Sequence, residues 1–266
     1  VQGRPGDERS WLLAFDAKVM RDLRELWTLR SKLHVAVYQH ATVKNAGHVI
    51  GDVLALAEPH FDVDGRGTRL RDCLDDEDRF MALGDWILDA IGASAAPELQ
   101  PARGLLLQLR QRRLYKRVVA STVAPNAAGI TLEAIKSGIL AEVANAGQRE
   151  ELSRLLIPDT IHITPAKHAG DDPLARVVFV DAKRDADGPS GLRPLTLRGG
   201  AAPPSVFSSS TFRERTVLVF LRRRHDGATL TPELEATARA AAQEWERQQI
   251  FLGTLLPAAL VPAQDL

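Results

Sequence analysis

The segment "LRSKLHVAVYQHATVKNAGHVIGDVL", residues 29–54, concentrates hydrogen-bonding side chains on a short stretch of chain. Its first twelve positions contain Arg30, His34, Tyr38, Gln39 and His40. Three of the seven histidines in the chain lie between residues 34 and 48. Such a group of side chains could hold a metal ion, bind a ligand or face water, and the spacing of the residues helps to separate these interpretations.

Apolar spacing predicts that this segment is helical. Leucines and one valine recur at steps of three and four from Leu23 to Val37, which predicts a helix beginning near Lys18 with one apolar stripe. A second helical pattern covers about residues 43–57. The polar group therefore lies on the first helix and on the turn that leads into the second.

On the first helix, three polar side chains share a face beside the apolar stripe. Arg30, His34 and Tyr38 follow one another at steps of four residues. An arginine offers a bidentate fork for phosphate, a tyrosine offers a flat face for a sugar or base, and Gln39 adds an amide. The set suits a nucleotide or another anion, and a polar face that only meets water remains an open alternative.

A metal site is the least favoured interpretation. His34, His40 and His48 are six and eight residues apart, whereas zinc sites on helices place two histidines four residues apart. His40 and His48 are two turns apart, which is too far for one ion. The pair His225-Asp226 follows a predicted strand and precedes Gly227, so we interpret it as a surface turn.

Composition excludes several classes of protein. The 266 residues carry 34 Lys and Arg against 34 Asp and Glu, so no net charge draws the chain to nucleic acid, and that partner is unsupported. Cys73 is the only cysteine, which excludes an internal disulfide. No apolar run reaches about 18 residues and no signal peptide is recognisable, so we expect a nuclear or cytoplasmic protein without a membrane span.

The remaining pattern predicts an α+β fold with a mainly helical N-terminal half. The predicted domains are residues 1–121, mainly helical, and residues 122–266, a smaller α+β lobe with a short antiparallel sheet and a mobile loop at 183–204. Further helices are expected at about 76–91, 98–112, 131–145, 148–156 and 232–250, and strands at 114–121, 159–166, 175–182, 193–198 and 215–224. Asp75 and Asp76 are candidate N-caps of the 76–91 helix, and Thr231 is the expected N-cap of the 232–250 helix. The expected core face of the 76–91 helix consists of Phe80, Leu83, Ile87, Leu88 and Ile91.

Three segments occur in an order that resembles a known family. Arg30 is followed eight residues later by Tyr38-Gln39-His40, and then by "VIGDVLALAE". The segments "DCLDDEDRFMALGDWILDAI" and "ARGLLLQLRQRRLYKRVVAS" come next. This succession resembles the deoxynucleoside triphosphate triphosphohydrolases that carry a SAM domain and an HD domain. The resemblance implies that residues 1–121 are the C-terminal portion of an HD-type helical domain.

The resemblance also implies roles for individual residues. Arg30 would bind substrate phosphate, Tyr38 would pack on the deoxyribose and exclude a 2′-hydroxyl, and Gln39 would lie against the base. His34 would line the same pocket. The residues implied to contact activating nucleotides at the subunit interfaces of a homo-oligomer are Lys18, His40, Arg112 and Lys116.

Two departures from the family pattern concern its activators. Asp16 and Ala41 stand where the family has basic residues that touch activator phosphates. An aspartate there repels a triphosphate, so activator binding is expected to be weakened, altered or lost.

The family's divalent metal is held by two His and two Asp upstream of the matched region. We therefore expect this chain to be the C-terminal half of a dNTP triphosphohydrolase. It would bind deoxynucleoside triphosphates, hold no metal and be inactive alone. A non-catalytic module for nucleotide binding or oligomerisation is the alternative, and an unrelated helical scaffold is a third reading.

Overall fold

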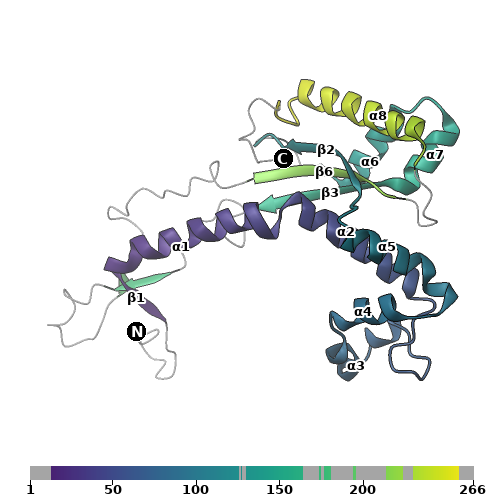
Figure 1. Ribbon diagram of the computed structural model, residues 1–266. Helices are drawn as coiled ribbons and strands as arrows, with labels where there is room; N and C mark the ends of the chain where they lie inside the picture. Colours follow the sequence, from purple (N-terminus) through teal and green to yellow (C-terminus); the bar gives the residue numbers. More distant parts are fainter. Residues whose placement is uncertain are drawn as a thin grey trace. The chain divides into compact units, whose positions relative to one another are not determined.

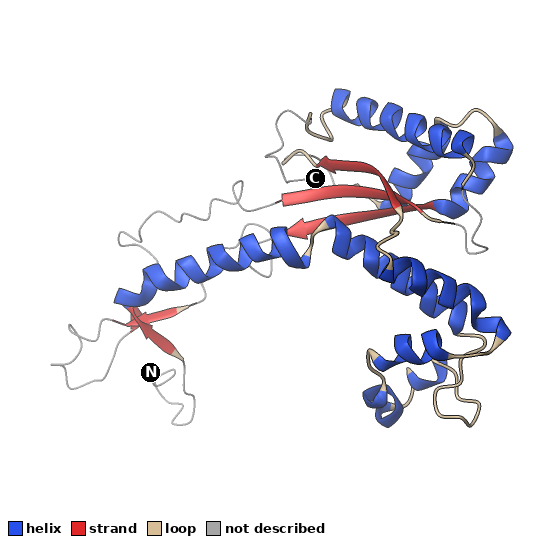
Figure 2. Cartoon of the chain, viewed as in Figure 1, coloured by secondary structure: helices blue, strands red, loops and turns tan. Residues whose placement is uncertain are grey.

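The computed structural model describes residues 13–125, 127, 130–163, 174, 177–180, 194–195, 214–223 and 230–257. The chain divides into two compact units. Figures 1 and 2 show the helices and strands that these units contain. Unit 1 combines residues 1–38 with 161–215, and unit 2 combines residues 39–160 with 216–266.

Unit 1 contains a small sheet and one long helix. Its elements are β1 (Ala14–Asp16), a 3-10 turn (Ala17–Val19), α1 (Met20–Leu33), a π-helix (His34–Tyr38), β4 (Val178–Val180) and β5 (Pro194–Leu195). In the sheet β4 is central, with β1 parallel to it and β5 antiparallel. The Phe179 side chain of the central strand is fully buried.

The helix predicted from about Lys18 is confirmed as α1, but its apolar stripe is largely exposed. Leu26 and Leu29 are 58% and 54% exposed, and Val37 is 50% exposed. The only buried residue of α1 is Ser31. The periodicity therefore predicted the helix correctly, while the residues that the structure describes do not cover its apolar face.

Unit 2 contains most of the helices and the larger sheet. Its elements are α2 (Ala41–Ala57), α3 (Glu77–Ala82), α4 (Trp86–Ala93), α5 (Gln100–Arg110), β2 (Lys116–Thr122), α6 (Leu132–Ala141), α7 (Ala146–Leu155), β3 (Leu156–Ile163), β6 (Glu214–Leu221) and α8 (Pro232–Phe251). The sheet order is β2-β6-β3, and β2 and β6 are antiparallel. The last few residues of β3 and the first two of β6 lie in the ranges of unit 1.

One hydrophobic core joins the sheet to the helices that follow it. Helix α8 packs against β2 and α6, and α7 packs against both of these helices (Figure 1). Thr231 caps α8 as predicted, since its hydroxyl accepts a hydrogen bond from the Leu234 amide. The core includes Ile135, Ile139, Leu152, Val217, Val219, Ala238, Ala242 and Trp245.

A second group of helices packs beside α2. Helix α5 lies along α2, and α4 packs on α5. The apolar faces follow the helical period, with Val49, Val53 and Ala57 of α2 buried together with Leu105 of α5. This packing fixes α2, whose first turn follows the predicted ligand residues Gln39 and His40.

The single helix predicted at 76–91 is wrong, because two short helices occupy that segment. Of the two candidate N-caps, Asp76 is the one that caps the first helix, and its carboxylate accepts a hydrogen bond from the Arg79 amide. The helix then stops at Leu83, whose backbone is extended. Phe80 is 53% exposed, so its assignment to the core is also wrong, whereas Ile87 and Ile91 are buried as predicted.

The predicted fold class is confirmed: a mainly helical N-terminal half is followed by an α+β region with a short antiparallel sheet. The domain boundary at residue 121 remains a prediction. The pair His225-Asp226 and most of the 183–204 loop lie outside the described residues. None of the described helices is long and apolar enough to cross a membrane.

Candidate functional site

The predicted substrate-binding face lies at the C-terminal end of α1. Helix α1 ends at Leu33 and continues as the π-helix His34–Tyr38. Single π-turns inside helices are often found at functional sites. Arg30 is exposed, and its guanidinium carbon lies 5.8 Å from the centre of the Trp27 ring, within cation–π range.

His34 and Tyr38 contact each other in the π-helix. Their ring centroids are 5.2 Å apart with an interplanar angle of 62°, an edge-to-face arrangement. Tyr38 is 57% exposed, so part of its ring is available to a ligand. Arg30 and Tyr38 are therefore both accessible rather than sealed in a core.

The other two predicted residues of this segment belong to unit 2. Gln39 is half-buried, and the His40 Nδ1 atom accepts a hydrogen bond of 3.2 Å from the Thr42 amide as the N-cap of α2. An accepting Nδ1 leaves the imidazole proton on Nε2. The four predicted substrate-binding residues are thus not brought together within one unit.

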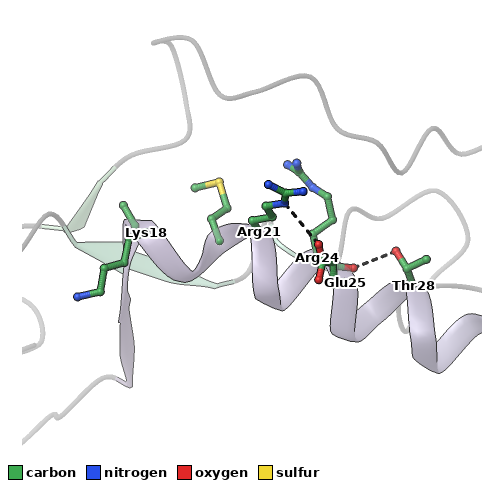
Figure 3. Close-up of a pocket in the computed structure, with 7 residues that line it drawn as sticks. Lys18, Arg21, Arg24, Glu25 and Thr28 are labelled. Atoms are coloured by element: carbon green, nitrogen blue, oxygen red, sulfur yellow. Dashed lines mark hydrogen bonds and ion pairs between the residues drawn. The ribbon is translucent and has the colours of Figure 1, made fainter.

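Lys18 lies in a pocket of about 500 Å³ at the start of α1 (Figure 3). Its ammonium group is 3.3 Å from an oxygen of Asp16, and the Lys18 amide donates to the same carboxylate. Asp16, one of the two departures from the family pattern, therefore pairs with the lysine that the resemblance assigns to activator binding. The pocket is lined by Ala17, Lys18, Met20, Arg21, Arg24, Glu25 and Thr28.

Arg21 and Arg24, which also line this pocket, were not among the residues predicted from the sequence. Arg21 pairs with Glu25 across 3.4 Å, and the Nε atom of Arg24 is buried without a hydrogen-bond partner. The available signal was two arginines three residues apart in a predicted helix, which places them on one face.

The remaining predicted activator residues lie around the end of α5 and the start of β2. Arg112 has a left-handed backbone, with φ of 58°, just after α5, where glycine is usual. Lys116 donates to Glu235 of α8. The hydrogen bond from Lys116 lowers the pKa of the Glu235 carboxyl below its ordinary value. Lys116 is therefore already engaged by a carboxylate.

A row of polar side chains on α2 connects this helix to the sheet. This row was not predicted from the sequence. His48 Nε2 lies 3.0 Å from an oxygen of Asp159 in β3, and Lys44 Nζ lies 3.5 Å from the other oxygen. Burial alone would raise the pKa of Asp159, but the hydrogen bond to His48 and the charge of Lys44 outweigh it, so this pKa is lowered.

The row of polar side chains continues one turn further along α2. Asp52 accepts from the Tyr115 hydroxyl at 2.6 Å and from the Arg222 guanidinium at 2.6 and 2.8 Å. Burial raises the pKa of the Tyr115 hydroxyl, and the Asp52 carboxylate raises it further. The spacing of Lys44, His48 and Asp52 at i, i+4 and i+8 was visible in the sequence, but their partners were not.

The family's metal site needs two His and two Asp side chains grouped around one ion. Among them, no three His, Cys, Asp or Glu side chains are grouped so that they could hold a metal ion. The described part of the chain therefore does not provide the ligand set that the family's metal site needs.

Comparison with known proteins supports the resemblance noted in the sequence. No protein-family model matches the chain. The SAMHD1 homolog of Dictyostelium discoideum, a deoxynucleoside triphosphate triphosphohydrolase, is 32% identical over 106 residues, which is 40% of this chain and 19% of that protein. The chain resembles the SAMHD1 enzymes over part of its length. Danio rerio SAMHD1 is 30% identical over 112 residues, 41% of this chain and 18% of its own length.

Homo sapiens SAMHD1 is similar to this chain to about the same extent. It is 30% identical over 104 residues, which is 38% of this chain and 17% of the human protein. The chain thus spans a little under one fifth of the SAMHD1 relatives that it matches. These matches support a relation to the dNTP triphosphohydrolases.

Proposed function

We propose that this chain supplies substrate-binding and regulatory residues to a dNTP triphosphohydrolase, which cleaves a dNTP to deoxynucleoside and triphosphate. The similarity to the SAMHD1 enzymes carries the proposal. The accessible Arg30 and Tyr38 at the end of α1 support it, because these side chains match the chemistry of a deoxynucleotide.

The proposed substrate contacts follow from the side chains. The Arg30 guanidinium binds phosphate oxygens through two parallel hydrogen bonds. Tyr38, steadied by its edge contact with His34, packs on the deoxyribose. A ribose would bury its 2′-hydroxyl against that ring without a partner, which costs free energy and favours the deoxy sugar. Gln39 lies against the base.

The reacting centre is proposed to lie outside these 266 residues. In the parent enzyme a divalent metal would polarise the phosphoryl oxygens, and this chain would contribute the binding wall. The 266-residue chain alone is then expected to bind dNTPs without hydrolysing them. Robust release of triphosphate from dNTP by the purified chain in the presence of divalent metal would refute this division of labour.

The proposed regulatory residues are Lys18, His40, Arg112 and Lys116, acting on activating nucleotides in a homo-oligomer. The exposed apolar stripe of α1, which includes Leu26 and Leu29, supports contact with a second copy, because exposed apolar patches commonly mark interfaces. Since Lys18 and Lys116 are already paired with carboxylates, an activator has to displace these pairs, and its affinity is reduced accordingly.

Equilibrium binding of dNTPs and rNTPs tests the substrate assignment. Arg30→Ala removes charge-assisted hydrogen bonds worth about 1.5–3 kcal/mol, so dNTP affinity should fall by about 10- to 150-fold. Tyr38→Ala should reduce the preference for dNTP over rNTP. Arg247→Ala, at an exposed arginine of α8 paired with Glu244, is the matched control and should bind normally. Equal affinities for Arg30→Ala and Arg247→Ala would contradict the assignment.

The second candidate function is a non-catalytic module that binds nucleotides or a subunit partner. The ion pair between Asp16 and Lys18 favours it, because an altered activator site fits a chain whose regulation has changed. A turnover assay on the full-length protein that contains this chain separates the two candidates. Metal-dependent hydrolysis of dNTP supports the enzyme, whereas saturable dNTP binding without turnover supports the module.

A further inference from the structure

Two guanidinium groups face the same pocket at the start of α1. Arg21 and Arg24 are three residues apart on the helix, and Figure 3 shows their guanidinium groups close together on one side, while the Lys18 side chain extends away from them. Neither arginine is among the residues to which the family resemblance gives a role. The pocket therefore has a feature that the proposed function does not use.

Among the described residues that line the pocket, positive and negative charges are not balanced. Its lining includes three cations, Lys18, Arg21 and Arg24, and one carboxylate, Glu25. Lys18 is paired with Asp16 outside the lining, which leaves two arginines against one glutamate. The side chains of Arg21 and Glu25 are 86% and 70% exposed, so their ion pair is weak and easily displaced.

Arg24 has the strongest demand for a partner. Its Nε atom is buried without a hydrogen-bond partner, one of two such side-chain atoms among the described residues. A guanidinium stays charged at any accessible pH, so it cannot relieve the burial by losing a proton. Buried polar atoms in folded proteins nearly always have a partner, so this guanidinium lacks part of the set of hydrogen bonds that it can donate. An anion in the pocket would offset its charge.

We propose that this pocket is a binding site for an oligophosphate chain, held between the Arg21 and Arg24 guanidinium groups. Arginine forks match phosphate oxygens in a bidentate manner. The volume of about 500 Å³ lies within the range of about 300–1,000 Å³ typical of small-molecule sites and exceeds what one phosphate needs. Inorganic triphosphate and the triphosphate of a nucleotide share this chemistry.

Glu25 sets the strength of the site, because it competes with the anion for Arg21. An incoming phosphate must displace the Glu25 carboxylate from Arg21 and then lies near its negative charge. Removal of that charge should strengthen binding, so Glu25→Gln is expected to bind more tightly than the natural protein. A gain of affinity at an exposed side chain cannot arise from unfolding.

Calorimetric titration of the 266-residue chain with inorganic tripolyphosphate at low ionic strength tests the site, with dATP as a second ligand. Arg24→Gln should weaken tripolyphosphate binding at least tenfold, and Glu25→Gln should tighten it severalfold. Arg247→Gln is the matched control on α8 and should bind like the natural chain. Circular dichroism of Arg24→Gln checks that its helix content is unchanged.

The results separate this inference from the proposed function. Arg30→Ala should leave tripolyphosphate binding intact, since Arg30 is not in the pocket. Absence of saturable tripolyphosphate binding, or equal affinity of Arg24→Gln, Glu25→Gln and the natural chain, overturns the inference and leaves the dNTP assignment of Arg30 untouched. If dATP binds tightly and tripolyphosphate weakly, with both sensitive to Arg24→Gln, the nucleotide is the source of the phosphate chain.

Discussion

The packing of α6 on α8 leaves no space at Gly138. A Cβ atom at this position would lie 2.5 Å from Nε1 and 2.6 Å from Cδ1 of Trp245. Heavy atoms that are not bonded sit comfortably at about 3.5–4.0 Å, so the indole would have to move by about 1 Å. Trp245 is 3% exposed and belongs to the core, which leaves little room for that movement. Gly138→Ala should therefore destabilise unit 2.

The magnitude follows from two opposing effects. Replacing glycine by alanine inside a helix stabilises it by about 1 kcal/mol through backbone propensity. Forcing an additional methyl group into a packed core costs about 1–3 kcal/mol, and contacts this short belong at the upper end of that range. The expected net loss is about 2 kcal/mol. For a domain of about 150–250 residues this lowers Tm by about 4–8 °C.

Gly51 provides the matched control. It lies inside α2, it is exposed, and a Cβ there meets nothing within 4 Å. Gly51→Ala should therefore gain the helix propensity without a clash and raise Tm by about 2–4 °C. Thermal and urea unfolding of the natural chain and the two variants, followed by circular dichroism, measures both effects.

The two variants should shift Tm in opposite directions, so one set of unfolding curves tests the clash at Gly138 against the helix propensity at Gly51. If Gly138→Ala is as stable as Gly51→Ala, then the indole of Trp245 does not lie against α6 as described. If both variants lose stability, the helical propensity argument fails at Gly51, while the clash at Gly138 remains supported.

Further predictions concern charged groups and one strained backbone position. Asp52→Asn removes the negative charge that accepts two hydrogen bonds from Arg222, so the free energy of unfolding should fall by about 2–3 kcal/mol. Urea unfolding should then show a lower midpoint, while the dependence of the unfolding free energy on urea concentration stays unchanged. The lowered pKa of Asp159 adds stability above the unfolded pKa of about 3.9 and loses it as pH falls through the lower folded value. The stability advantage of the natural chain over Asp159→Asn should thus shrink when urea unfolding is repeated below about pH 4. Arg112→Gly should relieve about 1 kcal/mol of left-handed backbone strain and raise Tm, while nucleotide titration shows weaker activator binding. Asp16→Asn keeps an N-cap but removes the charge held against the neighbouring lysine, so activator affinity should rise up to about fivefold in the same titration.

Elements with local signals were predictable from the sequence. Helix α8 has its N-cap Thr231 and Pro232 at its first position, and both ends of α8 lie within a residue of the prediction. Hydrophobic periodicity likewise indicated α2. These signals come from residues within one or two turns of each other, so one segment of sequence contains all the information needed.

Features that depend on distant partners were not predictable. His48 pairs with Asp159, which is 111 residues away in the sequence, and nothing near His48 indicates that partner. The break between α3 and α4 has a partly local cause, since the backbone at Leu83 is extended and the Trp86 indole donates to a carbonyl of the preceding helix. Periodicity alone runs through such a break, because the apolar spacing continues on both sides.

The predicted ligand residues also differ in what a ligand must displace. Lys18 and Lys116, assigned to activators, each hold a carboxylate partner, whereas Arg30 lies over the Trp27 ring and has no carboxylate partner among the described residues. A phosphate that reaches Arg30 therefore breaks no ion pair. A phosphate that reaches either lysine must first separate one. Because these are surface pairs worth about 0–1 kcal/mol each, we expect the proposed activator binding to be weakened without being abolished and the proposed substrate binding at Arg30 to be unaffected.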